Sequence, residues 1–496
     1  MSRKGIYIIL SLFISCAVKG QETFEEFKKR IGSEFSLFKE TTEKDFEDFR
    51  NKINEEYSSL LKKTWKEFNA IKGISVPDKD KVVPPVVYPD EDKNKPIKDN
   101  PKPFEEIVPV VKPIPQPDPI VPIEETPEPA VDIYYAFDFF NTKLQVRLEE
   151  KNRFTLRNCS EAEIARVWTI LSGPDYNNVI NDCLRIRSQC KLCDWAYLLL
   201  LRDLSNAFFK GHNNESVLFT AYLYCQSGYK MRLASANDRL YLLYASNHII
   251  YERSYWEIDG ERFYPLDCNL KQLYICQVAF PKEKPLSLQI GTEQLFSLSI
   301  SAQRSLQSER YQDVKAIVNT NENLIKFFDS YPTSMINDDF GTRWAMYANT
   351  PLSQQASQTL YPALRNAVNG KSQIDAVNRL LNFVQTAFVY EYDDKIWGGD
   401  RAFFADETLY YPYCDCEDRS ILFSRLVRDL LGLKVVLIYY PGHLATAVNF
   451  TENVTGDYIT INGKRYVICD PTYIGAPVGA TMPNMDNTSA KVILLE

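Results

Sequence analysis

An internal duplication is the feature that most constrains the fold of this 496-residue chain. Three blocks recur in register: 140–143 with 340–343, 216–219 with 420–423, and 258–263 with 461–466. The offset between the copies stays between 200 and 204 residues, and a glycine follows the second block in each copy, at Gly228 and Gly432. Chance similarity rarely keeps register over such a distance. The sequence therefore predicts two related domains, at 132–300 and 301–496.

The hydrophobic pattern of the second copy predicts helices followed by strands. A helix is expected over about 417–430, because it would end at the Gly432 cap. Strands are expected near 434–440, 444–450, 458–461 and 466–469, with Asn462-Gly463 as a hairpin turn. The predicted class is α+β, with helices packed on an antiparallel sheet.

Two segments of different composition open the chain. In residues 1–20, Arg3 and Lys4 stand before a short apolar run, which predicts a secretory signal peptide and an exported protein. Lipidation at Cys16 is the alternative. Residues 21–72 carry large side chains that recur every eleven positions from 24 to 68, which predicts an amphipathic helical stalk. This helix would self-associate, dock on a partner or dock on the globular part of the chain.

The segment that follows, residues 73–131, is rich in proline. It holds 15 of the 27 prolines, mixed with Val, Lys, Asp and Glu, and such a composition cannot bury a core. We expect an extended spacer in polyproline II geometry. With the helix before it, the spacer would tether the domains to a cell envelope; a plain disordered linker is the alternative.

Charge and cysteine usage narrow the functional classes. The net charge is -8 and no run of Lys, Arg and aromatic residues is present, so we set nucleic-acid binding aside. Ten cysteines follow the predicted signal peptide, and in an oxidising compartment some of them should form disulfides. Cys190 and Cys193 have the spacing of half a zinc site, but no matching second half accompanies them. We therefore predict no metal and no cofactor.

A nucleophile, a base and an orienting carboxylate are predicted in the second copy. Cys416 stands at the start of the predicted helix, where the positive end of the helix dipole favours a thiolate. His443 opens a strand and could accept the thiol proton, while Asp470 ends a later strand and could fix the imidazole tautomer. Cys414 is the rival nucleophile. It could instead pair with Cys469 in a disulfide beside the site.

These residues resemble the transglutaminase-like superfamily of papain-fold enzymes. Three blocks carry the resemblance: Thr408-Leu409 before Cys416 with Asp418 and Ser420, His443 with Ala445, and Asp470-Pro471-Thr472. Two features depart from the family pattern. Cys414 stands where a glycine is usual, and the aromatic residue often found shortly after the histidine is missing.

The resemblance implies an exported cysteine hydrolase that cuts peptide or amide bonds of a protein or peptide through a thioester. The same triad supports Gln–Lys crosslinking in other members, so transamidation is an alternative. The oxyanion would be held by the Cys416 backbone N–H and by an upstream indole or amide, for which Trp397 and Gln385 are the candidates.

The first copy lacks the same chemistry. An offset of 204 puts His212 at the position of Cys416 and Arg239 at that of His443, while Asp267 matches Asp470. Neither replacement offers a thiol or a base, so this copy is predicted to be a non-catalytic relative. It would shape the cleft of the second copy, bind substrate or serve the structure alone. A non-catalytic binding or assembly protein of the envelope is the rival function for the whole chain.

Overall fold

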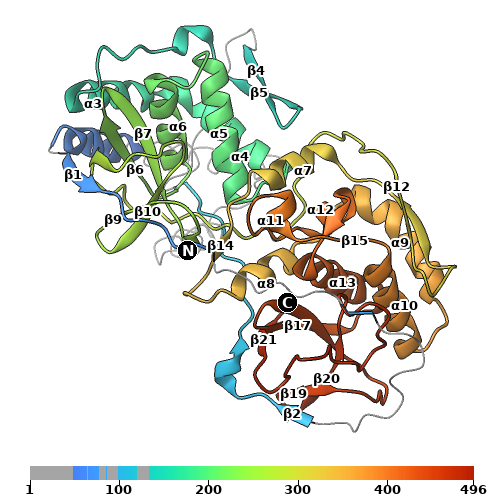
Figure 1. Cartoon of the computed structure of the whole chain (residues 1–496). Helices are drawn as coiled ribbons and strands as arrows, with labels where there is room; N and C mark the ends of the chain where they lie inside the picture. The colour runs from blue at the N-terminus through green and yellow to red at the C-terminus, as the bar shows by residue number, and fades with distance from the viewer. Residues whose placement is uncertain (1–48, 64, 77–84, 87–98, 120–132) are drawn as a thin grey trace, which may run out of the picture.

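The computed structural model describes residues 49–63, 65–76, 85–86, 99–119 and 133–496. The predicted signal peptide and the predicted helix before residue 49 lie outside these residues. Two lobes, each with its own sheet and helices, lie side by side (Figure 1). We call residues 133–300 the N-terminal lobe and residues 301–496 the C-terminal lobe. The mixture of helices and antiparallel sheets confirms the predicted α+β class.

The N-terminal lobe begins with a β-hairpin and four helices. The hairpin is β4 (Tyr134–Phe139) with β5 (Thr142–Arg147), and the helices are α3 (Glu161–Leu171), α4 (Asn177–Gln189), α5 (Asp194–Phe208) and α6 (Asn214–Gln226). The sheet follows, with β6 (Met231–Ala236), β7 (Arg239–Ala245), β9 (Trp256–Ile258), β10 (Glu261–Pro265) and β11 (Gln272–Ile275). A short strand, β8 (Ile249–Ile250), pairs with β14 (Ser334–Met335) of the other lobe.

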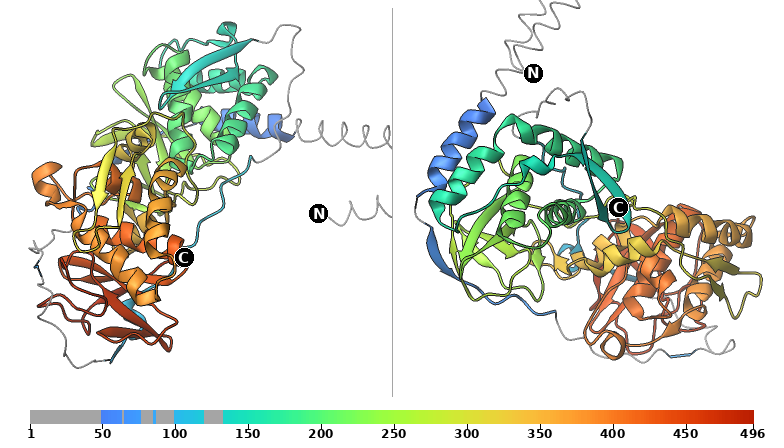
Figure 2. Two further views of the ribbon diagram at one scale, coloured as in Figure 1. Left: turned by 90° about the vertical axis from the view of Figure 1, so that its right-hand side faces the viewer. Right: turned by 90° about the horizontal axis from the view of Figure 1, so that it is seen from above.

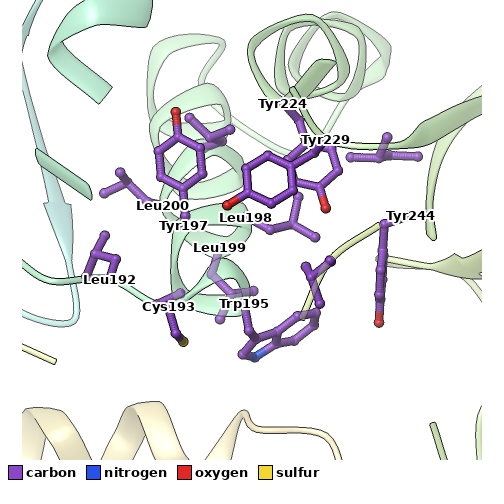
Figure 3. Close-up of a cluster of buried hydrophobic side chains, with 14 of the residues drawn as sticks. Leu192, Cys193, Trp195, Tyr197, Leu198, Leu199, Leu200, Tyr224, Tyr229 and Tyr244 are labelled. Atoms are coloured by element: carbon purple, nitrogen blue, oxygen red, sulfur yellow. The ribbon is translucent and has the colours of Figure 1, made fainter. Parts of the chain in front are cut away.

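Helix α5 lies at the centre of this lobe and is buried along most of its length. Aromatic rings surround it, and Figure 3 shows Trp195 and Tyr197 on α5 near Tyr224, Tyr229 and Tyr244. The rings of Tyr224 and Tyr229 stack with their centroids 4.5 Å apart. A helix buried along most of its length requires cover on several sides, and α6 and the β4–β5 hairpin lie against it.

The C-terminal lobe places several short elements before its sheet. These are β12 (Arg304–Gln307), β13 (Lys315–Val318), α7 (Glu322–Asp329), β14, α8 (Thr342–Asn349), α9 (Gln354–Val368), α10 (Gln373–Thr386), β15 (Val389–Tyr390), α11 (Asp393–Ile396), α12 (Ala405–Tyr410) and β16 (Tyr413–Cys414). Helix α13 (Cys416–Leu431) comes next and ends at Gly432, whose φ is 66°. The strands are β17 (Lys434–Tyr440), β18 (His443–Asn449), β19 (Tyr458–Ile461), β20 (Lys464–Cys469) and β21 (Lys491–Leu494).

The two sheets repeat one strand order. The N-terminal sheet runs β9-β10-β7-β6-β11, with one further strand at the β11 edge. The C-terminal sheet runs β19-β20-β18-β17-β21, with one further strand at each edge. In both lobes a helix, α6 or α13, leads directly into the central hairpin. The first recurring block does not follow this scheme. Residues 140–141 form the turn of the β4–β5 hairpin, with Asn141 at φ 54°, and 142–143 begin β5. Residues 340–343 instead lead into α8, so the match predicted for that block is wrong.

The described part of the N-terminal stalk packs on the N-terminal lobe. Residues 49–61 are helical, and Figure 2 shows this helix alongside the lobe. The Tyr57 ring lies 5.0 Å from that of Trp168, and Ser58 Oγ donates a hydrogen bond of 2.8 Å to the carbonyl of Ala165. The prediction that this helix continues to residue 72 is wrong, because the helix ends at residue 61. β1 (Lys66–Asn69) instead pairs with the sheet edge at β11, which covers that edge.

In residues 99–119 the proline-rich segment packs on both lobes. The prediction of an extended spacer is therefore wrong for these residues. β2 (Asp99–Pro101) pairs with β19, and β3 (Ile107–Val108) pairs with β21, so the segment adds a strand to both edges of the C-terminal sheet. It then returns to the N-terminal lobe, where Gln116 donates to the carbonyl of Leu192 at 2.7 Å. Edge strands tolerate proline because one side of the strand needs no ladder hydrogen bond.

The predicted disulfides are also wrong for the described residues, because all ten cysteines from Cys159 to Cys469 are free thiols. Seven of them are buried and pack as small apolar side chains. Cys414 and Cys469, the pair suggested beside the site, direct their thiols to separate carbonyls, those of Val389 and Val467. Among the described residues no helix has the length and apolar character that a bilayer span requires.

Candidate active site

The nucleophile candidate is the first residue of α13. Asp415 caps the helix, accepting from the N–H of Glu417 at 3.2 Å, and Asp418 accepts from the N–H of Asp415 at 3.0 Å. This reciprocal capping box fixes the first turn. Cys416 is 4% exposed and lies where the helix dipole favours negative charge.

The base and orienter candidates stand on neighbouring strands. His443 opens β18, Asp470 follows β20, and the two strands pair with Thr446 opposite Cys469. His443 Nε2 lies 2.8 Å from Asp470 Oδ2. The other carboxylate oxygen accepts the backbone N–H of Thr472 at 2.9 Å, so the carboxylate is held from both sides.

Packing of α13 on β18 brings the thiol to the imidazole. One turn after Cys416, the Ser420 hydroxyl donates to the carbonyl of Leu444 at 2.8 Å, and Leu444 adjoins His443. This contact explains the small residue in the motif, because a larger side chain would hold the helix away from the strand. The structure therefore brings Cys416, His443 and Asp470 into one buried cluster.

The charge of His443 is set by its two partners. Burial alone would lower its pKa, but the Asp470 carboxylate and then the Cys416 thiol raise the pKa to about 10. Nδ1 is buried and makes no hydrogen bond of ordinary geometry with any described residue. Because Nε2 is held by Asp470, Nδ1 is the nitrogen left to face the thiol. At neutral pH the ring is an imidazolium, which favours a thiolate beside it.

A second charged group touches the thiol and was not predicted from the sequence. Cys416 Sγ donates to Glu417 Oε2 at 3.3 Å, and Glu417 is fully buried. Arg343 Nη2, on α8, lies 3.5 Å from Glu417 Oε1 and 2.5 Å from Asp400 Oδ2. The Arg343 side chain is fully buried and shares its charge between the two carboxylates. Glu417 follows the nucleophile directly, but its partner lies 74 residues away, so no local pattern pointed to the network.

Carboxylates crowd the start of α13. Asp393, Asp415 and Asp418 have oxygens within 4.8 Å of one another, as do Asp393, Asp400 and Glu417. Burial, followed by the charges of Asp415 and Asp393, holds the pKa of Asp418 well above its ordinary value. A retained proton and the Arg343 guanidinium thus compensate negative charge here, and we assign no metal.

The two oxyanion candidates from the sequence have different surroundings, and the amide of Gln385 is already occupied. The Gln385 amide nitrogen donates to three backbone carbonyls, those of Asp470, Tyr473 and Ala476. Gln385 therefore braces the loop that holds Asp470. The Trp397 ring packs on Tyr411, with the centroids 4.8 Å apart, under the guanidinium of Arg401.

A tyrosine that was not predicted from the sequence interacts electrostatically with the thiol. Tyr390 stands opposite Cys414 in the parallel strand pair β15–β16. Cys414 is two residues before Cys416 in the chain. Burial, and then the charges of Cys416 and Asp415, raise the pKa of Tyr390 well above its ordinary value. Its hydroxyl therefore remains a donor at neutral pH. Several tyrosines surround this motif in the sequence, and only the pairing of β15 with β16 singles out this one.

The equivalent place in the N-terminal lobe has no room for a substrate. His212, Tyr241 and Asp267 line a cavity of only about 10 Å³, roughly the space of one water molecule. Arg202 lies 3.7 Å from Asp267, so the partner of this carboxylate is an arginine rather than a histidine. Arg239 begins β7 as His443 begins β18, but its side chain is exposed.

Comparison with known proteins yields no relative. No protein-family model matches the chain, and no curated protein or solved structure matches it either. The chemistry of the described residues is therefore the basis for assigning a function.

Proposed function

We propose that the chain is an exported cysteine hydrolase of the transglutaminase-like type, which cuts peptide or amide bonds of a protein or peptide. One observation carries the proposal. A cysteine at a helix start adjoins an imidazole whose far nitrogen lies 2.8 Å from a fixed carboxylate, and the three residues come in the order Cys416, His443 and Asp470. These are the groups that thioester chemistry requires.

The steps follow from the positions of the groups. The Cys416 thiolate attacks the carbonyl carbon of the scissile bond, and the negative charge moves to the carbonyl oxygen. The backbone N–H of Cys416 and the Tyr390 hydroxyl are the donors we assign to that oxygen. The His443 imidazolium gives its proton to the leaving amine, which departs and leaves a thioester. Water then loses a proton to the imidazole and attacks the thioester, so the acid is released and the thiolate and imidazolium are restored.

We also propose that the lobes are tandem papain-like domains of this superfamily and that the first is non-catalytic. The shared strand order, with a helix leading into the central hairpin of each sheet, supports a common origin. The tight cavity around Asp267 and the exposed Arg239 support the loss of chemistry in the N-terminal lobe.

A labelling experiment tests the proposal. The full chain is treated with an alkyne-bearing iodoacetamide at neutral pH, and the labelled cysteines are identified by mass spectrometry. We expect Cys416 to react well ahead of the buried thiols of Cys414 and Cys469, because only Cys416 adjoins an imidazolium. Cys416→Ala is the matched control. Labelling of Cys414 ahead of Cys416 would contradict the assignment.

A second experiment separates hydrolysis from transfer. The chain is incubated with a denatured protein mixture and a labelled primary amine, and new amino termini and incorporated label are both counted. We expect Cys416-dependent new termini with little incorporation. Label that exceeds hydrolysis would replace the hydrolase by a crosslinking enzyme, and neither product would favour the binding or assembly function.

A further inference from the structure

The three residues of the proposed site are almost closed off from solvent. The exposed fraction is 4% for Cys416, 1% for His443 and 2% for Asp470. Attack on a peptide bond requires the sulfur to touch the carbonyl carbon, so a substrate cannot react while these side chains stay covered. Part of the chain beside the thiol must therefore move before each turnover.

A short segment lies on the first turn of α13. It comprises residues 392–397, with α11 at its centre. The Asp393 carboxylate lies within 4.8 Å of the carboxylate of Asp415, which caps α13, and also of the carboxylate of Glu417. Glu417 in turn accepts the Cys416 thiol at 3.3 Å. The inner side of the segment thus lies beside the nucleophile.

The chain is anchored on both sides of this segment. Before it, the N–H of Glu391 donates to the carbonyl of Cys414 at 3.2 Å, which ties the chain to β16. After it, Arg401 pairs with Asp329 on α7 at 2.6 Å and with Glu407 on α12 at 2.5 Å. A movement that uncovers the thiol can therefore be confined to the residues between these two anchors.

Two glycines stand between the segment and its second anchor. Gly398 has a φ of 76°, and an added Cβ at either Gly398 or Gly399 would meet no atom within 4 Å. Both residues line a cavity of about 370 Å³. Glycine changes its backbone conformation at little steric cost, and the open space leaves room for the change. The glycine pair is therefore the hinge of the segment.

One side chain of the segment packs across this hinge. The Trp397 ring lies 4.8 Å from the ring of Tyr411 and 5.7 Å from that of Phe403, measured between centroids. The Arg401 guanidinium lies 4.5 Å from the Trp397 centroid. Aromatic pairs and a cation over a ring both stabilise the closed position. Trp397 thus fastens the segment to the part of the chain that Arg401 anchors.

We propose that residues 392–397 form a lid over the Cys416 thiol, which turns about Gly398 and Gly399 and is latched by Trp397. The inference rests on the proposed function and adds to it the control of access to the same site. In the closed position the thiol is sheltered from solvent and from small electrophiles. A peptide substrate displaces the lid and reaches the thiol.

The test measures how fast iodoacetamide alkylates Cys416 in the full chain at neutral pH. Trp397→Ala removes the latch, and we expect alkylation to be about tenfold faster, since the ring contacts favour the closed position by roughly that factor. Gly399→Ala stiffens the hinge, and we expect alkylation to be about twofold to fivefold slower, because alanine reduces the freedom of the open segment. The two changes therefore act in opposite directions.

Each variant has a matched control. Gly291→Ala is the same change at another position where an added Cβ meets no atom within 4 Å, and Ile396→Ala shortens an exposed apolar side chain of the lid. Both controls should alkylate within about twofold of wild type.

Hydrogen–deuterium exchange of residues 392–397 gives a second measurement that needs no reaction at the thiol. Exchange should be faster than in wild type for Trp397→Ala and slower for Gly399→Ala. Gly399→Ala replaces no packed side chain, so it keeps the test decisive if Trp397→Ala does not fold.

The outcomes separate the lid from the proposed function. Alkylation and exchange that are the same in wild type, Trp397→Ala and Gly399→Ala overturn the lid and leave the proposed function standing. A Cys416 that stays unreactive in Trp397→Ala also overturns the lid, because loss of the latch should uncover the thiol. Alkylation that responds to both changes, without Cys416-dependent new amino termini from a protein substrate, supports the lid and removes the proposed function.

Discussion

Each lobe has its own sheet, and the two sheets have the same strand order. The lobes differ in what surrounds the helix that leads into the sheet. In the N-terminal lobe α5 and α6 are separated only by residues 209–213, whereas in the C-terminal lobe residues 387–415 stand between α10 and α13. That longer segment carries Tyr390, Asp400 and Glu407, which lie around the nucleophile or line the adjacent cavity. The comparison teaches that a sheet with this strand order can position a base and a carboxylate. The residues that surround the thiol come from the segment before α13.

The largest expected effect concerns the residue that most distinguishes the lobes. Cys416→Ala should lower turnover by at least about a thousandfold, because no other group can form the thioester. The fold should persist, since a small side chain at a capped helix start is replaced by another small one. Turnover is measured as new amino termini, and circular dichroism checks the fold. Cys414→Ala is the matched control and should remain active; an inactive Cys414→Ala beside an active Cys416→Ala would reverse the assignment.

The next effect tests the one triad position that both lobes keep. Asp470→Asn should lower kcat by about a hundredfold or more, because the amide no longer stabilises the imidazolium or fixes its tautomer. Asp267→Asn, the equivalent change in the N-terminal lobe, should leave kcat within about twofold, since Arg202 rather than a base adjoins Asp267. Equal losses in both variants would mean that the N-terminal lobe takes part in the chemistry.

Sequence patterns singled out the three residues that the structure brings together, because each stands at one end of a local element. Cys416 begins a helix with a capping box, His443 opens a strand after a turn, and Asp470 stands before a proline. Such signals depend on neighbours in the chain. The strand order of the two sheets also followed the duplication in its last two blocks.

Features set by distant partners could not be predicted in this way. β1 pairs with a strand 203 residues or more away, so its four residues look like the end of the preceding helix until the sheet edge is known. The contact of Arg343 with Glu417 spans 74 residues and depends on α8 packing against α13. Gln385 offers an amide in the right part of the sequence, but only the fold reveals three carbonyls that occupy it.

A third prediction concerns pH and the buried ion pair of the C-terminal lobe. The pKa of His443 is about 10 in the folded chain against an ordinary 6.5, so the folded state holds a proton that the unfolded state has lost between these values. The stabilisation is complete below pH 6.5 and disappears as pH rises through 10, at about 1.4 kcal/mol per pH unit.

Urea unfolding at pH 6, 8 and 10 measures this effect. The difference in unfolding free energy between wild type and His443→Gln should shrink as pH rises, because glutamine can donate to Asp470 but does not titrate. A difference that stays constant over this range would show that His443 is not an imidazolium in the folded chain.

The smallest expected effect is at two positions of the N-terminal lobe, which we propose to be non-catalytic. His212 and Arg239 stand where the C-terminal lobe has Cys416 and His443, yet both side chains are exposed. Substitution of an exposed residue usually changes stability by less than about 0.5 kcal/mol. His212→Ala and Arg239→Ala should therefore leave kcat within about twofold of wild type, whereas His443→Ala removes the proton donor to the leaving amine. If Arg239→Ala raises KM and leaves kcat unchanged, the N-terminal lobe binds substrate; if it matches the loss in His443→Ala, the lobe is catalytic and the contrast between the two copies fails.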